Sequence, residues 1–502
     1  MENSKNWRKR EVWTADKRAT GVTTLAFLSL MFFSCTPHIR VGVVGMTAAG
    51  SAQADSAAAM RDSLQRVSES IDFGTAFDTT ITADSVAEQT TDTAPTPEPE
   101  PAVRPVLFPP FSVSSKKVRV ALMRDVGRAV LYSAATVTLQ NGHSRQRFNL
   151  RGRVLVESKT GDRTVTVSTA AEKFRIALPC TLKSGNGYNF FEIGDAAYRG
   201  DIIIVASRNA KFIVINYLDV EEYLRGVLPI EMGKRPAEEI EALKAQAVAA
   251  RTYTYRRIAE RSGEPYDCVS TVADQVYGGS SVEYREADIA VRATADLVMT
   301  SGGSVVNAYY HSTCGGMTAD VHEAWGKPKC PYLQPVSDIN PQTGVPYCIS
   351  SAWFAWEERW NTKRFSTIVT RSLQKLFPSK RFSAPVNRLA VEERFSCGRV
   401  KRLCIEGNGW KHDCGADRTR FIMRRDVAGE PILRSSNFEI LSGVDRQTVV
   451  IRGKGYGHGV GMCQMGAIGR ARAGQNFVTI LTSYYKGVVI STATAQPGGI
   501  VR

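Results

Sequence analysis

KFIVINYLDVEEYLRGVLPIEMGKRPAEEIEALKAQAVAARTYTYRRIAER, residues 211–261, contains the two patterns from which the fold class follows. Its opening run, residues 211–216, is typical of a β-strand. From Pro236 onward apolar residues recur at helical spacing, and the proline and the glutamates beside it suit the first turn of a helix. The predicted apolar face comprises Ile240, Leu243, Ala247, Ala250 and Ile258, interrupted by Thr254. The stretch therefore predicts a strand followed by a long amphipathic helix that ends near Arg261.

The residues upstream predict more strands. Apolar and polar residues alternate at a period of about two in 118–123, 135–139, 163–168 and 174–178, and 202–206 continues the series. Gly, Asn and Asp turn signals separate these runs. We expect a β-rich subdomain over residues 115–217, a mixed region with the long helix over 218–492 and a short tail over 493–502. The predicted fold class is α+β.

The N-terminus indicates export. Basic residues, among them Lys5 and Arg18, precede an apolar run from Gly21 to Ser34 that is too short to span a bilayer comfortably. The run ends in Phe-Phe-Ser-Cys, which resembles a bacterial lipobox with Cys35 as the acylated residue. We therefore predict a lipoprotein signal peptide over 1–34 and a lipid anchor in the membrane at Cys35. The alternatives are an ordinary signal cut near Ala54 and an uncleaved anchor helix.

The next segment, residues 35–114, is predicted to be a disordered tether. It is rich in Ala, Ser, Thr and Asp and becomes proline-rich before residue 102, a composition that buries too little apolar surface to fold. Residues 47–104 hold ten acidic side chains and three arginines, although the whole chain carries a net charge of +15. The folded part is therefore basic and suits a polyanionic partner. Export places that partner in the cell envelope, in the periplasm, and argues against nucleic acid.

Three further segments carry the chemistry. The first runs from Glu222 through Pro229-Ile-Glu-Met into the long helix. The second is Tyr310-His-Ser-Thr-Cys-Gly-Gly-Met-Thr, and the third is Gly453-Lys-Gly-Tyr-Gly-His-Gly-Val-Gly-Met-Cys-Gln-Met-Gly-Ala. In this order and at these separations they resemble the sporulation stage II protein D (SpoIID) and LytB amidase-enhancer family, over roughly residues 115–492.

The resemblance implies that the glycan strands of peptidoglycan are the substrate. Family members that act as enzymes resemble lytic transglycosylases, which cleave between N-acetylmuramic acid and N-acetylglucosamine and leave a 1,6-anhydro end. They prefer strands that lack stem peptides, and no cofactor is required. Other relatives are described as enhancers of a cell-wall amidase, so a non-catalytic glycan-binding enhancer is the alternative function. The family's catalytic glutamate falls on Glu231.

Glu231 also suits that role on physical grounds. A transglycosylase needs one acid to protonate the leaving oxygen, because the sugar's own 6-hydroxyl replaces water and a second carboxylate is dispensable. The sequence predicts that Glu231 lies in a proline-flanked turn before a helix. A helix N-terminus stabilises the carboxylate, whereas a general acid must keep its proton. Desolvation by Ile230 and Met232 is expected to offset this effect.

The expected substrate-binding residues come from the same segments and from two weaker positions. Polar groups of the second and third segments are expected to line the glycan groove. The glycines of the third segment should let its backbone pass close to the substrate, and its side chains should offer stacking and hydrogen bonds. The complete set is Arg251, Tyr277, His311, Ser312, Thr313, Tyr456, His458 and Gln464. For each residue the alternative is a packing, ion-pairing or turn-forming role.

The cysteines allow either a zinc site or a disulfide. His311 and Cys314 have ligand-like spacing, and Cys330 or Cys348 could complete a zinc site. The resemblance also implies zinc in some relatives, but the cysteine spacing here departs from theirs. The competing interpretation is a Cys314–Cys330 disulfide, which fits an oxidising compartment. The favoured prediction has no metal, with zinc at His311, Cys314 and Cys330 as the alternative.

Overall fold

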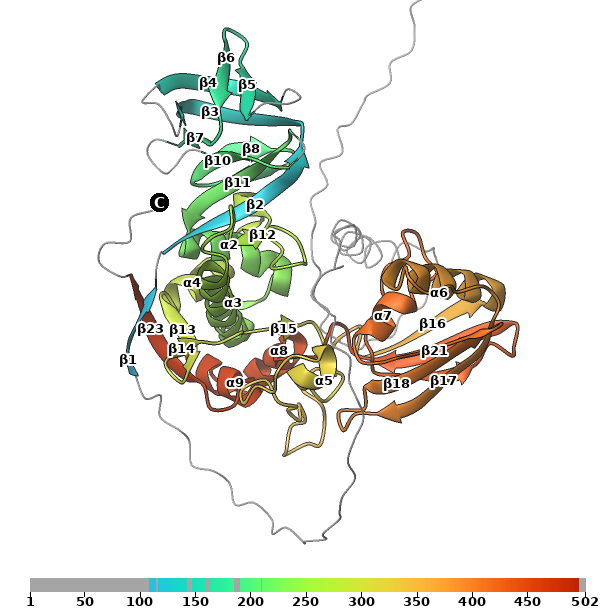
Figure 1. The fold of residues 1–502 in the computed structure, drawn as a ribbon. Helices are drawn as coiled ribbons and strands as arrows, with labels where there is room; N and C mark the ends of the chain where they lie inside the picture. The colour runs from blue at the N-terminus through green and yellow to red at the C-terminus, as the bar shows by residue number, and fades with distance from the viewer. Residues whose placement is uncertain are drawn as a thin grey trace, which may run out of the picture. The chain divides into compact units, whose positions relative to one another are not determined.

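The computed structural model describes residues 108–113, 116–141, 147–158, 163–184, 190–208 and 210–495 (Figure 1). Within these ranges it is a β-rich mixture of helices and strands, as predicted. The runs predicted as strands form β2 (Lys117–Val126), β3 (Arg128–Asn141), β5 (Thr164–Ser168), β6 (Lys173–Ala177), β10 (Asp201–Ala206) and β11 (Phe212–Asp219). Between them lie β4 (Arg147–Ser158), β7 (Cys180–Lys183), β8 (Phe191–Ile193) and β9 (Ala196–Tyr198).

One large sheet contains all these strands. Its order is β12-β2-β11-β10-β7-β3-β4-β5-β6, where β12 is Cys268–Val269, and β8 joins it through β3. The alternating residues of the strands meet in one core, which includes Leu131, Val156, Leu182 and Ile204. Burial of every second side chain is what the period-two pattern predicts.

Strand β11 connects this core to the helices. Phe212 and Val214 belong to the core of the large sheet, whereas Ile213 and Ile215 pack on the opposite face with Val269. Further along the strand, Leu218 enters the core of the helical part. Because β11 is buried on both sides, it fixes the start of α2 (Val220–Met232), which follows it directly.

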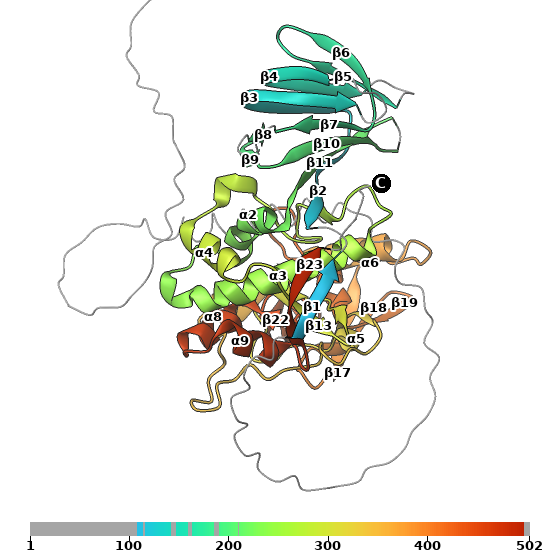
Figure 2. The same cartoon turned by 90° about the vertical axis from the view of Figure 1, so that its left-hand side faces the viewer.

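The long helix α3 (Ile240–Glu260) begins after a short 3-10 turn, η1 (Ala237–Glu239), and its end agrees with the prediction. The prediction of a single apolar face is wrong. Ala245, Ala249 and other residues outside that face are fully buried. The helix contacts α2, α4 (Arg285–Ala293), α8 (Gln464–Arg472), α9 (Phe477–Tyr484) and β13 (Leu297–Ser301). Its many alanines allow neighbours to approach all around, with α2 and α4 on one side and α8 and α9 on the other (Figures 1 and 2).

The two ends of the described chain meet in a small sheet. Its order is β1-β23-β13-β14, where β1 is Phe108–Val113, β23 is Val489–Ala495 and β14 is Ser304–Val305. Strand β1 runs parallel to β23 and pairs Phe111 with Ala493. The predicted boundaries are therefore wrong at both ends. Residues 108–113 of the predicted tether and 493–495 of the predicted tail are ordered strand, because each supplies the backbone partner of the other.

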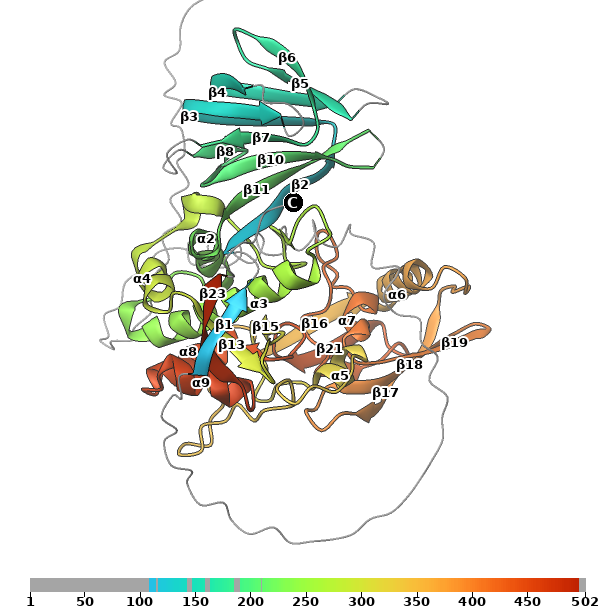
Figure 3. The same ribbon diagram turned by 60° about the vertical axis from the view of Figure 1, so that its left-hand side comes forward.

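Residues 355–454 form a further unit that the sequence analysis did not separate from the region 218–492. Two three-stranded sheets, β16-β21-β20 and β17-β18-β19, enclose a separate apolar core with α6 (Figure 3). The elements are β16 (Ala355–Asn361), α6 (Thr362–Leu376), β17 (Val386–Arg394), β18 (Val400–Gly407), β19 (Trp410–Cys414), α7 (Arg418–Ile422), β20 (Phe438–Ser442) and β21 (Thr448–Lys454). Trp360 and Phe365 anchor this core.

The predicted signal peptide, Cys35 and the tether up to residue 107 lie outside the described residues. Among the helices that the structure does describe, none combines the length and the apolar character needed to cross a bilayer.

Candidate functional site

Glu231 lies in the last turn of α2, which corrects the prediction of a turn before a helix. The helix begins after Asp219, whose carboxylate accepts the N–H of Glu221, and it ends at Gly233 with a φ of 69°. Pro229 lies inside it, so near the end that the loss of one backbone hydrogen bond does not stop the helix. The C-terminal end of a helix disfavours negative charge, whereas the N-terminus expected from the sequence would favour it.

The carboxyl group of Glu231 is reached from two other parts of the chain. Its Oε1 accepts a hydrogen bond of 2.9 Å from the backbone N–H of Val276, and its Oε2 lies 3.4 Å from the amide nitrogen of Gln464. The phenol of Tyr310 is close enough that burial and then the charge of Glu231 raise its pKa. Tyr310 belongs to the second motif and Gln464 to the third. The three motifs therefore meet at Glu231.

Gln275 holds the loop that supplies the Val276 N–H. It is fully buried, and its Oε1 accepts hydrogen bonds from the hydroxyls of Thr254 and Tyr223. Its amide nitrogen donates to the Tyr310 hydroxyl at 3.0 Å. Gln275 could not be predicted from the sequence, because a glutamine in a loop gives no periodic or spacing signal.

Arg251 lies in the interior, which corrects its prediction as a substrate-binding residue. Its side chain is 0% exposed, and its Nε and Nη2 each donate to a carboxylate oxygen of Glu221 at 2.6 Å. The guanidinium also donates to the backbone carbonyls of Val291 and Leu297. A glycan cannot reach a group buried in this way, so the role that the structure assigns to Arg251 is to tie α2 to α3.

Tyr277 is also a packing residue. Its ring lies between those of Tyr198 and Tyr223, with centroids 5.7 and 4.8 Å away, and its hydroxyl donates to Asn216. Gly226 permits this arrangement, because a Cβ there would lie 2.5 Å from the Tyr277 ring. The tyrosine therefore links α2 to β11, and the prediction of a direct substrate contact is not supported.

The second motif forms β15 (Tyr310–His311), which pairs in parallel with β22 (Met462–Cys463) of the third motif. His311 is buried, its Nδ1 lies 3.2 Å from the carbonyl of Val460, and burial holds its pKa well below the ordinary value. Thr313 is also buried, with its hydroxyl 2.7 Å from that of Ser351. Only Ser312 of the three predicted groove residues is partly exposed.

In the third motif, the glycines allow close contact between backbones. Gly455 has a φ of 81°, and a Cβ there would lie 2.6 Å from the carbonyl oxygen of Thr313. Tyr456, which is partly exposed, pairs through its backbone with Thr313. Its ring lies 6.0 Å from that of Trp353, a partly exposed tryptophan in the segment before β16. The guanidinium carbon of Arg434 lies 4.0 Å from the Trp353 centroid, so one face of this ring is already covered.

His458 packs against other rings in the same region. Its centroid lies 4.8 Å from Trp325 and 5.5 Å from His311, and its Nδ1 accepts the N–H of Val460. Burial lowers the pKa of His458 from 6.5 to about 4. The neutral ring therefore fits an internal hydrogen bond better than a role as proton donor at neutral pH.

We expect this histidine to make folding sensitive to acid. Because its pKa is lower in the folded chain than in the unfolded one, the unfolded chain takes up the proton first, and stability falls as the pH drops from about 6.5 towards 4. The variant His458→Gln should lose less thermal stability than the wild type between about pH 7 and about pH 5. Melting curves across this range test the prediction, with His322→Gln, at an exposed position, as the control. An unchanged pH slope in His458→Gln contradicts it.

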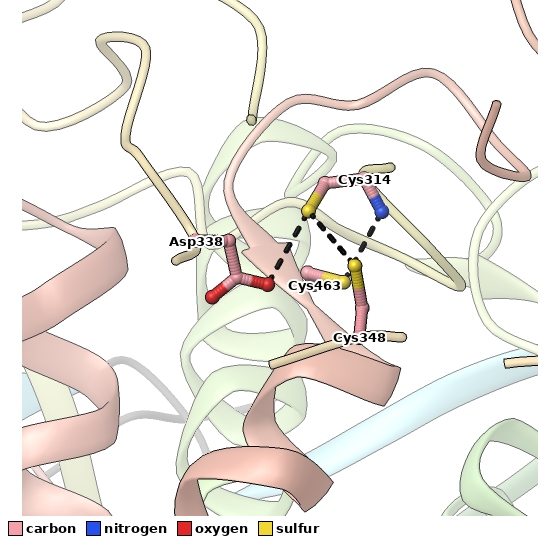
Figure 4. Close-up of side chains that lie close together, drawn as sticks. All are labelled: Cys314, Asp338, Cys348 and Cys463. Atoms are coloured by element: carbon pink, nitrogen blue, oxygen red, sulfur yellow. Dashed lines mark hydrogen bonds between the residues drawn. The ribbon is translucent and has the colours of Figure 1, made fainter. Parts of the chain in front are cut away.

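Of the predicted zinc ligands, only Cys314 and Cys348 come together, with their Sγ atoms 3.6 Å apart. Cys330 is partly exposed and close to Tyr332, and His311 points to Val460. Cys314 instead lies in a group with Asp338, Cys348 and Cys463, whose ligand atoms all lie within 4.8 Å of one another (Figure 4). The sequence pointed to Cys314 and Cys348 but not to Asp338 or Cys463, which lie 24 and 149 positions from Cys314. None of the nine described cysteines forms a disulfide, so the proposed Cys314–Cys330 bridge is not observed.

Comparison with known proteins agrees with this architecture. The family model described as stage II sporulation protein (SpoIID) matches residues 208–301, which include Glu231, and a domain of unknown function (DUF8618) matches residues 348–461. The second match covers the separate unit with its own core.

Relatives extend the similarity. An uncharacterized protein of Brachyspira hyodysenteriae is 31% identical over 60% of this chain and 74% of its own length. The stage II sporulation protein D of Bacillus subtilis is 30% identical over 56% of this chain and 77% of its own. The amidase enhancer of Bacillus subtilis is 31% identical over 54% of this chain, but only 40% of that protein is covered. The chain therefore belongs to the SpoIID family.

Proposed function

We propose that the protein is a peptidoglycan lytic transglycosylase that cleaves strands of N-acetylmuramic acid and N-acetylglucosamine, with Glu231 as its acid and base. One observation carries the proposal: the second and third motif segments reach the Glu231 carboxyl group of the first through Tyr310 and Gln464, and the backbone N–H of Val276 joins them. A carboxyl group oriented by neutral amide donors can give up a proton and take one back.

In this mechanism the protonated Glu231 donates its proton to the glycosidic oxygen as the bond from that oxygen to the muramic C1 breaks. The carboxylate that remains then accepts the proton of the same sugar's 6-hydroxyl, whose oxygen bonds to C1. The product is a 1,6-anhydro ring, and no water is consumed. The Val276 N–H and the Gln464 amide stabilise the carboxylate stage by hydrogen bonding.

A second function is favoured by one relative. The amidase enhancer of Bacillus subtilis shares 31% identity over 54% of this chain. In the corresponding proposal the protein binds glycan and stimulates a separate cell-wall amidase without cleaving anything itself. The basic net charge of +15 suits this binding as well, because muramic acid retains a carboxylate in strands stripped of peptides.

Both functions place the protein in the cell envelope. We propose that a lipid at Cys35 holds it on the outer side of a membrane and that residues 35–107 give the folded part reach towards the wall. Peptidoglycan is the expected partner in both cases, and an amidase is the partner only in the second.

Digestion of purified glycan separates the two functions. The exported protein is incubated with intact sacculi and with strands from which an amidase has removed the peptides, and the products are analysed by mass spectrometry. A transglycosylase releases anhydro-ended fragments, and releases more of them from the stripped strands. Binding to sacculi with no new ends, together with faster peptide release when amidase is added, contradicts the enzyme and supports the enhancer.

A further inference from the structure

Three cysteines and one aspartate converge from three parts of the chain. Cys314 follows β15, Cys463 ends β22 directly before α8, and Asp338 and Cys348 lie in the segment between α5 (Val321–Trp325) and β16. All four are buried, and Asp338 and Cys314 have 0% exposure. The Sγ atoms of Cys314 and Cys348 are 3.6 Å apart, and the Cys314 Sγ is 3.3 Å from Asp338 Oδ2 (Figure 4).

These separations match the edges of a tetrahedral metal site. Zinc binds thiolate sulfur at about 2.3 Å and carboxylate oxygen at about 2.0–2.2 Å, which places neighbouring ligand atoms about 3.5–3.8 Å apart. The four ligand atoms all lie within 4.8 Å of one another, so the most distant pair needs to close by only about an ångström.

Backbone N–H groups point at the sulfur atoms of Cys463 and Cys314. The Sγ of Cys463 accepts the backbone N–H groups of Cys314 and Gly466, both at 3.2 Å, and the Sγ of Cys314 accepts that of Gly316 at 3.3 Å. Cys463 also caps the N-terminus of α8, where the helix dipole favours negative charge. A buried thiolate needs these donors, whereas the disulfide of an ordinary pair does not.

Hydrogen bonds also fix the orientation of the Asp338 carboxylate. Its Oδ1 accepts hydrogen bonds from the hydroxyl of Tyr484 at 2.7 Å and from the guanidinium of Arg470 at 3.2 Å, which turns Oδ2 towards the sulfur atoms. Support of this kind from outside the ligand shell is typical of metal-binding carboxylates. Gly466 makes room for it, because a Cβ there would lie 2.1 Å from Asp338 Oδ2.

We propose that Cys314, Asp338, Cys348 and Cys463 bind one structural zinc ion. A disulfide would use two of the three thiols and leave a thiol and a buried carboxylate beside it, whereas a metal ion satisfies all four groups. Three thiolates select a soft or borderline cation, and four protein ligands leave no open position for substrate. The positive charge of Arg470 offsets part of the excess negative charge of the filled site.

The ligand group is linked to the candidate catalytic group through residues adjacent in sequence. Cys463 precedes Gln464, whose amide reaches Glu231, and Cys314 follows Thr313 in the second motif. A bound ion would therefore clamp the second and third motifs together and hold Gln464 in place. The inference stands on the ligand group alone, and it does not depend on whether the protein cleaves glycan.

Metal analysis of the full-length exported protein, purified without reducing agent or chelator, tests the site. We expect about one equivalent of zinc in the wild type and a roughly tenfold or larger loss in Cys348→Ser and Asp338→Asn. Cys330→Ser is the matched control, because this cysteine lies in the same region but outside the group, and it should keep its zinc. Glu231→Gln should also keep it.

A second measurement uses the wild-type protein, so it tests the site even when a variant does not fold. Exchange of the wild-type metal for cobalt should give the visible absorption of tetrahedral Co²⁺ together with sulfur-to-cobalt charge transfer, which no oxygen-only site shows. The thiols of Cys314, Cys348 and Cys463 should resist alkylation until a chelator is added. Zinc-free wild type, or a disulfide between any two of these cysteines in peptide maps, overturns the proposal.

Discussion

Glu231→Gln is expected to lower the release of anhydro-ended fragments from stripped glycan by at least roughly a hundredfold, the lower range of general acid–base catalysis. The amide cannot donate a proton to the leaving oxygen and cannot recover one from the 6-hydroxyl. Its carbonyl oxygen can still accept the Val276 N–H, so folding and binding to sacculi should persist. Initial rates of fragment release, measured with melting temperature and pelleting with sacculi, provide the comparison.

Glu222→Gln is the control for this variant. It makes the same chemical change in the same helix, at a partly exposed residue that pairs with Arg225 and Arg199. It should leave the rate of fragment release close to that of the wild type. If Glu231→Gln is as active as Glu222→Gln, the assignment of the acid is wrong.

Arg251→Met is expected to destabilise the fold by about 3–5 kcal/mol, the usual cost of removing one partner of a buried ion pair. The guanidinium is fully buried and holds both oxygens of Glu221, whose side chain is 26% exposed. Without it, α2 loses its tie to α3, and the carboxylate of Glu221 loses its cation. Denaturant unfolding monitored by circular dichroism measures the change.

Arg256→Met tests whether burial is the cause. Arg256 lies on the same helix and pairs with Glu260, but its side chain is 36% exposed, so a cost of less than about 1 kcal/mol is expected. Equal effects of the two substitutions would contradict the structural role of Arg251. A variant Arg251→Met that folds normally but has lost affinity for glycan would restore the original prediction of a substrate contact.

The strands and the long helix were predictable because their signals are local. Period-two alternation identifies β2 and β3, whose every second side chain enters one core, and the spacing after Pro236 identifies α3. The width of the buried surface of α3 was not predictable. Alanines such as Ala245 and Ala249 are ambiguous in a sequence, because they suit both a solvent-exposed face and a close helix contact.

The errors at the site arose where the local sequence does not show the surroundings of a residue in the folded chain. Pro229 suggested that no helix continues through this position, yet a proline near the end of α2 is tolerated. Glu231 therefore lies in the last turn of α2 and not in a turn at the start of the long helix α3. Arg251 and Tyr277 are polar residues near the motif, and only the tertiary structure shows that their partners are Glu221 and Asn216.

The ligand group depends on long-range contacts, which spacing cannot show. Cys463 is 149 positions from Cys314, and the pairing of β15 with β22 brings the two together. The separate unit over residues 355–454 lies between them in sequence and closes on its own core, so it interrupts the motifs without disturbing their contact. Short spacing therefore suggested Cys330 and Cys348 as partners of Cys314 and gave no sign of Cys463.

The central claim is that Glu231 gives a proton to the leaving glycosidic oxygen and takes one from the muramic 6-hydroxyl, with no water consumed. It is tested most directly by digesting stripped glycan in water enriched in oxygen-18. The account predicts fragments whose new ends carry no label and are lighter by one water than hydrolysed ends, and it predicts that Glu231→Gln does not form them. Labelled ends from the wild type, or unlabelled anhydro ends that form equally fast in Glu231→Gln, would contradict the account.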